Sequence, residues 1–68
     1  MDVTVNGQRA SVPEATTVAQ LLERLKVQPE RVVVEVNLAI IKRDQRATAV
    51  LQPHDTVEIV QFVGGGAA

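Results

Sequence analysis

Hydrophobic and polar residues alternate through the first twelve positions of the chain. Residues 1–5 read apolar, polar, apolar, polar, apolar, and residues 9–12 repeat the alternation after the pair Asn6-Gly7. Alternation places every second side chain on one face of a β-strand. Asn-Gly tolerates the positive φ angles that a tight type I′ turn needs. We therefore expect the chain to open with a β-hairpin.

A helical period follows the hairpin. The residues with the i, i+3, i+4, i+7 spacing of one helix face are Val18, Leu21, Leu22 and Leu25. Thr17 and Gln20 fit a capping box at the start of this helix, and Pro29 prevents its continuation. A helix of about ten residues is too short to be stable alone, so we expect its apolar stripe to pack on a sheet.

The second half of the chain predicts three further strands. The β-branched run of residues 31–37 suits a central strand, residues 40–42 form a short strand, and residues 56–63 form the longest and most apolar one. The connections are a tight turn at residues 37–39, a polar stretch at 43–46 that leads to 48–51, and a turn at 52–55 with Pro53 in its second position.

This order of elements predicts an α+β fold of the β-grasp, ubiquitin-like type. A helix between a hairpin and later strands returns a strand parallel to the first, because such crossovers are right-handed. We expect a mixed sheet of four to five strands with the last strand beside the first and one main helix across one face. The predicted boundaries are residues 1–63 for the domain and 64–68 for a flexible glycine-rich tail.

Composition excludes several classes of function. The chain has 68 residues, a net charge of −1 and no cysteine. A domain this small buries only about 60% of its unfolded surface, which disfavours a deep enzyme cleft. Charges of both signs are spread along the chain, unlike a nucleic-acid-binding surface, and no apolar run is long enough for a membrane span. We expect a cytoplasmic protein with no metal site and no thiol for sulfur chemistry of its own.

Glycine is concentrated at the end of the last predicted strand. Three of the four glycines are Gly64, Gly65 and Gly66, and Ala67-Ala68 follow them. A backbone without Cβ atoms can enter a narrow site where other residues do not fit. This pattern favours a terminal arm that reaches into a partner.

These features together resemble the ThiS family of sulfur carriers from bacterial thiamine biosynthesis. The pieces that carry the resemblance are Val5-Asn6-Gly7, Thr17-Val18 with Leu21-Leu22, Val34-Glu35-Val36-Asn37 with Ile40-Ile41 and Arg43, and residues 55–66. They span nearly the whole chain. The apolar strand that runs into a glycine pair is the most specific of them.

The resemblance implies a carrier without an active site of its own. A ThiF-like adenylyltransferase would use ATP to adenylate the carboxylate of Gly66, which follows Gly65. Sulfur from the persulfide of a cysteine desulfurase would then displace AMP and leave a thiocarboxylate. Thiazole synthase, ThiG, would receive the sulfur. No cofactor bound by the carrier itself is implied.

Ala67-Ala68 depart from the family pattern, in which the chain ends at glycine. Within a peptide bond the Gly66 carbonyl cannot be adenylated, so a trimming protease of the JAMM type would have to remove both alanines. Otherwise they block activation. Two other readings stay open: a sulfur carrier for molybdopterin or another sulfur metabolite, and a ubiquitin-like interaction module whose tail is inert.

The last predicted strand offers a candidate partner-binding surface. If Val57 and Ile59 face the core, alternation places Glu58, Val60 and Phe62 on the opposite face, next to Gly64 in the tail. We expect these four residues to contact partners. His54 stands alone without a second histidine or a cysteine, so we interpret it as an exposed turn residue, and we expect Arg43–Arg46 to form an exposed loop.

Overall fold

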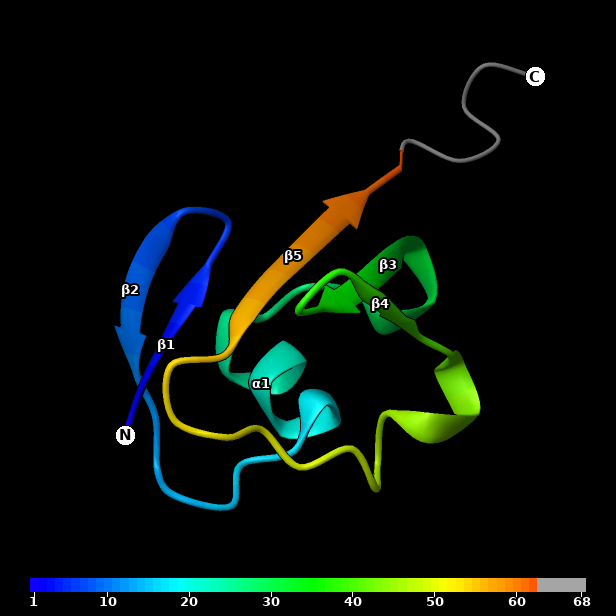
Figure 1. The fold of residues 1–68 in the computed structure, drawn as a ribbon. Coiled ribbons are helices and arrows are strands. Elements are labelled where there is room, and N and C mark those ends of the chain that lie inside the picture. Colours follow the sequence, from blue (N-terminus) through cyan, green and yellow to red (C-terminus); the bar gives the residue numbers. More distant parts are fainter. Residues whose placement is uncertain (63–68) are drawn as a thin grey trace, which may run out of the picture.

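In the computed structural model, residues 1–62 form a five-stranded mixed sheet with one α-helix across one face (Figure 1). The structure describes residues 1–62. The last predicted domain residue, Val63, and the predicted tail at Gly64, Gly65, Gly66, Ala67 and Ala68 lie outside the described range. The α+β, β-grasp prediction is confirmed.

The sheet has the strand order β2-β1-β5-β3-β4. Its strands are β1 (Asp2–Val5), β2 (Gln8–Ser11), β3 (Val32–Val36), β4 (Ala39–Ile41) and β5 (Thr56–Gln61). β1 is antiparallel to β2 and parallel to β5, and β3 is antiparallel to both β4 and β5. The last strand therefore lies beside the first, as the crossover rule predicts.

The opening hairpin turns at Asn6 and Gly7, whose φ angles are 49° and 82°. Two successive positive φ angles are the signature of a type I′ turn, so the predicted turn chemistry is confirmed. The β3–β4 hairpin turns in the same way at Asn37 and Leu38, with φ angles of 52° and 72°. Leucine seldom adopts this conformation, because its Cβ crowds the backbone there.

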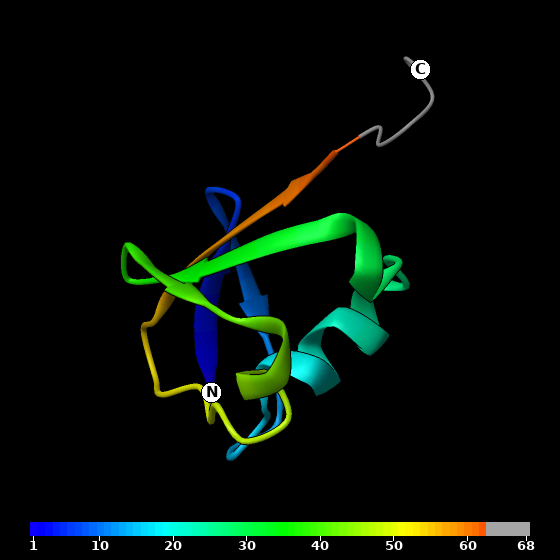
Figure 2. The ribbon, with the colours of Figure 1, turned by 90° about the vertical axis from the view of Figure 1, so that its right-hand side faces the viewer.

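The helix α1 (Val18–Leu25) begins at the predicted capping box. The Thr17 hydroxyl accepts a hydrogen bond from Gln20 N at 3.1 Å, and Thr17 N donates to Gln20 Oε1 at 2.9 Å. The helix ends at Lys26, whose φ of 58° is left-handed. Figure 2 shows α1 on one side of the sheet.

The core lies between α1 and the sheet. Its buried apolar residues are Val3, Val12, Val18, Leu21, Leu22, Val32, Val34, Leu51 and Val57. Leu25, the fourth residue of the predicted stripe, is 41% exposed. The prediction was wrong for Leu25 because α1 ends there, so no further turn of helix carries the stripe along the sheet.

The connection from β4 to β5 contains a buried arginine. Arg46 follows the 3-10 helix η2 (Arg43–Gln45) and is 6% exposed. Its guanidinium donates to the carbonyl oxygens of Pro29 and Val32, each at 2.7 Å. The expected exposed loop is therefore confirmed for residues 43–45 and wrong for Arg46, which links this loop to the 3-10 helix η1 (Pro29–Arg31) and the start of β3.

The turn before β5 has its predicted form. Asp55 N donates to Gln52 O at 3.1 Å, and His54 in the third position has a φ of 69°. His54 is exposed, as expected for a turn residue. Within residues 1–62, no helix has the length and apolar character that crossing a membrane requires.

Candidate docking face on the open side of the sheet

β5 is the strand that leads from the sheet toward the end of the chain, and it projects beyond the body of the domain (Figures 1 and 2). Val57 is fully buried and Ile59 packs against the core. Because side chains alternate along a strand, Glu58, Val60 and Phe62 point to the sheet face opposite α1. All three are exposed, so the predicted orientation is confirmed, whereas their role in partner binding stays a prediction.

Register extends this face onto two neighbouring strands. Val33 lies opposite Val60, and Glu35 lies opposite Glu58 on β5 and opposite Ile40 on β4. We call this surface the docking face; it consists of Val33, Glu35, Ile40, Glu58, Val60 and Phe62. The sequence analysis identified only its β5 members.

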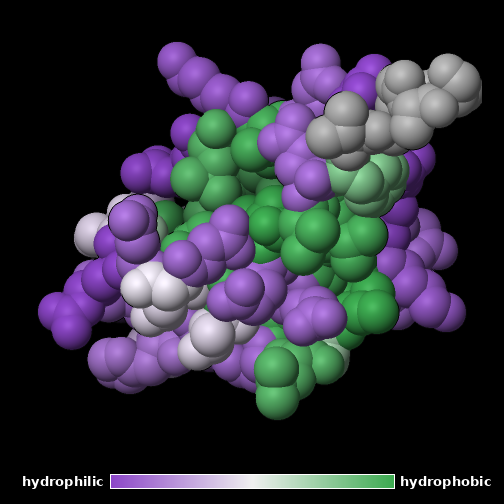
Figure 3. Space-filling view, turned by 90° about the horizontal axis from the view of Figure 1, so that it is seen from above, coloured by the Kyte–Doolittle hydropathy of each residue, from purple (hydrophilic) through white to green (hydrophobic). Residues whose placement is uncertain are grey.

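Four of the six residues of the docking face are apolar, and they are unusually exposed. Ile40 is 62% exposed, Val60 60%, Phe62 45% and Val33 37%. Single exposed apolar residues are common, but contiguous ones mark interaction sites. Figure 3 views the domain from the end at which β5 leaves the sheet and shows a continuous hydrophobic area there.

The backbone at the end of β5 is firmly held up to Phe62. Phe62 N donates to Arg31 O at 3.0 Å, which continues the β3–β5 ladder past Gln61. On the other side of β5, the Asn6 side chain binds the backbone of Ile59. The hydrogen bonding of the sheet thus continues as far as Phe62, next to residue 63, where the described range ends.

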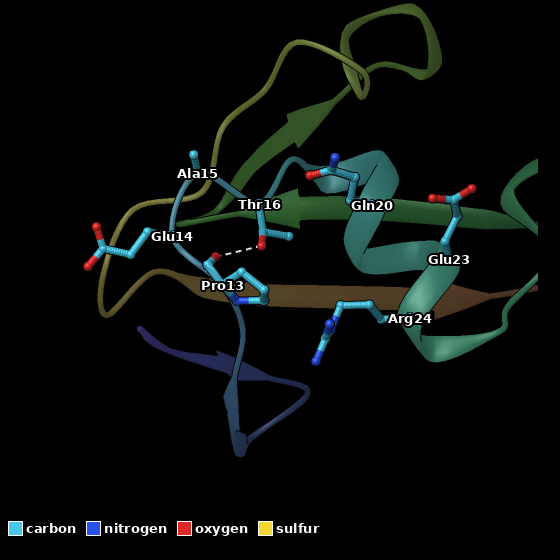
Figure 4. A pocket seen from close by; sticks show the side chains of 7 residues that line it. All are labelled: Pro13, Glu14, Ala15, Thr16, Gln20, Glu23 and Arg24. Atoms are coloured by element: carbon cyan, nitrogen blue, oxygen red, sulfur yellow. Dashed lines mark hydrogen bonds between the residues drawn. The ribbon is translucent and has the colours of Figure 1, made fainter.

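A surface hollow lies elsewhere. It measures about 510 Å³ and is lined by Pro13, Glu14, Ala15, Thr16, Gln20, Glu23 and Arg24 (Figure 4). The hydrogen bond drawn there joins the Thr16 hydroxyl to Pro13 O within the loop itself, at 2.6 Å. The polar side chains of Glu14, Gln20 and Glu23 do not converge on a common point. Binding sites typically combine an apolar lining with convergent polar groups, so this hollow lacks that character.

The sequence analysis also named a reactive glycine pair and one exposed histidine. Gly65 and Gly66, the predicted adenylation site, and Gly64, a predicted partner contact, lie outside the described residues. His54 lies at the far end of β5 from Phe62 and is exposed. In residues 1–62, no group of three His, Cys, Asp or Glu side chains is arranged to hold a metal ion.

Comparison with known proteins places this fold and sequence in one family. The sequence profile of the ThiS family matches residues 3–66. A crystal structure of the thiamine biosynthesis protein ThiS from Geobacter metallireducens is 39% identical, with a TM-score of 0.81 over 97% of this chain and 100% of that one. A solution structure of a thiamine biosynthesis protein from the same organism gives a TM-score of 0.78 and also 39% identity, over 97% of this chain and 88% of that one.

Two curated relatives carry a similar segment within a longer chain. The thiazole synthase of Magnetococcus marinus is 39% identical over 66 residues, and that of Paramagnetospirillum magneticum is 36% identical over the same length. In both cases the match covers 97% of this chain, which spans about 20% of the length of each relative. The family profile and the two matched structures agree with the β-grasp fold described above, and the chain belongs to the ThiS family.

Proposed function

We propose that this chain is a sulfur carrier of thiamine biosynthesis and not a catalyst. The observation that carries the proposal is the extent of the family match, which continues beyond β5 through Gly64 and Gly65 and ends at Gly66. The sequence resemblance assigns the reactive carbonyl to the same residue. The proposal thus gives the β-grasp body the role of presenting a glycine terminus to other enzymes.

The chemistry of the proposed cycle explains why glycine stands at the reactive end. A carboxylate is a poor electrophile until a leaving group is attached to it. The Gly66 carboxylate attacks the α-phosphate of ATP on a ThiF-like adenylyltransferase, and pyrophosphate leaves. The outer sulfur of a cysteine-desulfurase persulfide then attacks the acyl carbon and displaces AMP, which gives an acyl disulfide. A second thiol, supplied by a partner because this chain has no cysteine, attacks the desulfurase sulfur, forms a disulfide with it and releases the thiocarboxylate. Glycine lets this terminus enter two active sites without a Cβ in the way.

In this sequence Gly66 is followed by Ala67-Ala68, so the proposed cycle begins with a hydrolysis. The Gly66 carbonyl is an amide until a protease of the JAMM type cleaves the bond to Ala67. Water supplies the oxygen of the new carboxylate, and the segment that begins at Ala67 leaves with a new amino group. The full chain is therefore a latent form in this proposal.

Thiazole synthase is the proposed acceptor of the sulfur. Two relatives with that name contain a segment 39% and 36% identical to this chain, which supports a functional pairing of such a domain with the synthase. The docking face is the proposed contact surface. It lies on β5 and its neighbours, within a few residues of the glycines.

An adenylation assay tests the proposal. A chain ending at Gly66 is incubated with ATP and a ThiF-like enzyme, and exchange of labelled pyrophosphate into ATP is measured; the full chain is the matched control. We expect exchange with the chain ending at Gly66 and none with the full chain. Absence of exchange from both chains, with an enzyme that activates another ThiS protein, would identify an inert ubiquitin-like module instead.

Intact-mass spectrometry of the native protein tests the trimming step. We expect a species that lacks Ala67-Ala68 and carries sulfur in place of one oxygen at Gly66. Retention of both alanines in every species, together with a thiazole pathway that still operates, contradicts the proposed trimming.

A further inference from the structure

Two carboxylates lie directly opposite each other in the docking face. Glu35 on β3 and Glu58 on β5 are register partners. Asn37 N donates to Thr56 O in the same ladder, and since hydrogen-bonded pairs recur every second residue, Glu35 and Glu58 form a hydrogen-bonded pair with Cα atoms roughly 5.5 Å apart. Like charges directly opposite each other destabilise a sheet. The fold therefore carries a pair that costs it stability.

The domain itself does little to compensate these charges. Among residues 1–62, Asp55 is the one acid whose carboxylate accepts hydrogen bonds, from Asn37 Nδ2 at 2.9 Å and Gln52 N at 2.8 Å. Neither Glu35 nor Glu58 accepts such a bond there. In the direction of Phe62 their neighbours on this face are apolar, because Ile40 lies opposite Glu35, and Val33 and Val60 form the next open-face pair. In the other direction the next pair is Asn37 with Thr56, which is polar and uncharged, and Arg31 lies opposite Phe62 at the end of the same face.

This arrangement restricts what can cover the docking face. Glu35 and Glu58 lie on the same face as Val60, Phe62 and Ile40. A partner that covers these apolar residues therefore also removes water from the two carboxylates. Burial of an ionised carboxylate without a partner is costly, so a purely apolar or an acidic surface is disfavoured. A cationic group offsets that cost, and hydrogen bonds between charged groups are the strong ones.

We propose that Glu35 and Glu58 together bind an arginine side chain that thiazole synthase presents within an apolar surface. This inference rests on the proposed function, which supplies the identity of the partner. Arginine fits better than lysine because its planar guanidinium offers five donors and can bind two carboxylates at once. The apolar residues of the docking face supply contact area, and the pair of carboxylates selects the partner.

Affinity measurements on the full chain test this inference. Binding to thiazole synthase is measured for the wild type, Glu35→Gln, Glu58→Gln and the double variant, with Glu23→Gln as the control because Glu23 is exposed on α1, on the other side of the sheet. We expect the affinity to fall about tenfold or more in each single variant, as truncating one partner of a buried charge pair does. Glu23→Gln should leave it unchanged.

Two additional readouts separate binding from folding. The midpoint of urea unfolding should stay the same or rise in Glu35→Gln and Glu58→Gln, since the like-charge repulsion is removed. The affinity of the wild type should fall as salt is added, because salt screens charges, and the double variant should show a shallower dependence. A double variant with unchanged affinity and unchanged salt dependence overturns the inference.

The outcomes also distinguish this inference from the proposed function. If Phe62→Ala weakens binding to thiazole synthase while the double variant does not, the docking face is used without an arginine and only the inference fails. If the double variant loses affinity for the ThiF-like enzyme but not for thiazole synthase, the assigned occupant is wrong. If the wild type shows no affinity for thiazole synthase, the proposed partner itself fails.

Discussion

The side chain of Asn6 binds the backbone of Ile59 through both ends of its amide. Oδ1 accepts from Ile59 N at 2.8 Å, and Nδ2 donates to Ile59 O at 3.2 Å. The register of β1 with β5 covers Thr4 and Val5, and the backbone pairing continues with Asn6 N, which donates to Val57 O at 2.9 Å. The Asn6 side chain therefore supplies the next rung of the ladder and holds β5 where it leaves the sheet.

Asn6 has two roles, since its backbone forms the turn and its side chain binds Ile59. Replacement of Asn6 by glycine should separate them. Glycine keeps the positive φ of the turn at no steric cost, but it removes both hydrogen bonds to Ile59. We expect Asn6→Gly to lower the free energy of unfolding by about 1 to 2 kcal/mol. Asn6→Asp retains the acceptor and should cost less. Urea unfolding measures both losses, and equal stability of Asn6→Gly and wild type would show that water replaces the side chain fully.

The hairpin and the helix start could be predicted because their chemistry is local. Asn6-Gly7 forms a type I′ turn, and Thr17 with Gln20 forms a capping box, within four residues of sequence. The position of β5 beside β1 was predictable for a different reason, since handedness leaves few ways to connect the elements. These features depend little on distant contacts.

The burial of Arg46 could not be predicted from its polar surroundings. Its acceptors, the carbonyl groups of Pro29 and Val32, lie 17 and 14 residues earlier in the chain.

The contribution of Val33, Glu35 and Ile40 to the docking face could not be predicted from the sequence either. Residues 32–34 are all valine, so the sequence shows no alternation there, and only the register with β5 decides which side chains face outward.

Leu22→Ala tests the packing of α1 against the sheet. Leu22 is 1% exposed in the core, and truncation of such a residue leaves a cavity. We expect a loss of about 2 to 5 kcal/mol in the free energy of unfolding. Leu25→Ala is the matched control, because Leu25 belongs to the same helix and is partly exposed; it should lose about 1 kcal/mol or less. Similar losses in the two variants contradict the burial described here.

The stability of the domain should depend on both the charge and the shape of the side chain at position 46. Burial, followed by the positive charge of Arg43, lowers the pKa of the Arg46 guanidinium, and its Nε has no hydrogen-bond partner among residues 1–62. The cost of this burial is offset by the bonds to Pro29 O and Val32 O. Arg46→Met keeps much of the apolar stem but leaves both carbonyl groups without their donor.

We expect Arg46→Met to lower the free energy of unfolding by about 2 to 4 kcal/mol, since each buried unsatisfied group costs about 1 to 3 kcal/mol. Arg46→Lys keeps a single cationic donor group and should fall between Met and wild type. Arg43→Met is the control, because the exposed Arg43 donates a single bond, to Glu30 O. Thermal or urea unfolding measures the series, and a stable Arg46→Met would show that water satisfies the two carbonyl groups.

Leu38 combines a φ of 72° with an exposed fraction of 88%. Its side chain gains little from packing, while its Cβ costs about 1 to 2 kcal/mol in a left-handed conformation. Leu38→Gly should therefore stabilise the β3–β4 hairpin by about 0.5 to 1 kcal/mol after the greater chain entropy of glycine is subtracted. Leu38→Ala removes the side chain but retains the Cβ and should change stability little. If alanine stabilises as much as glycine, exposure and not backbone conformation is the cause.

Val60 and Phe62 provide the direct test of the docking face. Both are exposed on β5, so Val60→Ala and Phe62→Ala should change the free energy of unfolding by less than about 1 kcal/mol. Their affinity for thiazole synthase and for a ThiF-like enzyme should fall by about tenfold, as expected for an apolar residue at the centre of an interface. Val50→Ala is the matched control, because Val50 is 48% exposed in the connection before β5.

The decisive comparison is between Val60→Ala and Val50→Ala, which delete the same two methyl groups from exposed positions. Val50 forms an isolated bridge with Thr17, at the start of α1 and away from the docking face. If only Val60→Ala loses affinity, the location of the methyl groups matters and the open sheet face is the contact surface. If Phe62→Ala unfolds the domain, Phe62 belongs to the core and the proposed contact surface is wrong at that residue. Measuring unfolding and affinity on the same protein samples keeps these two outcomes apart.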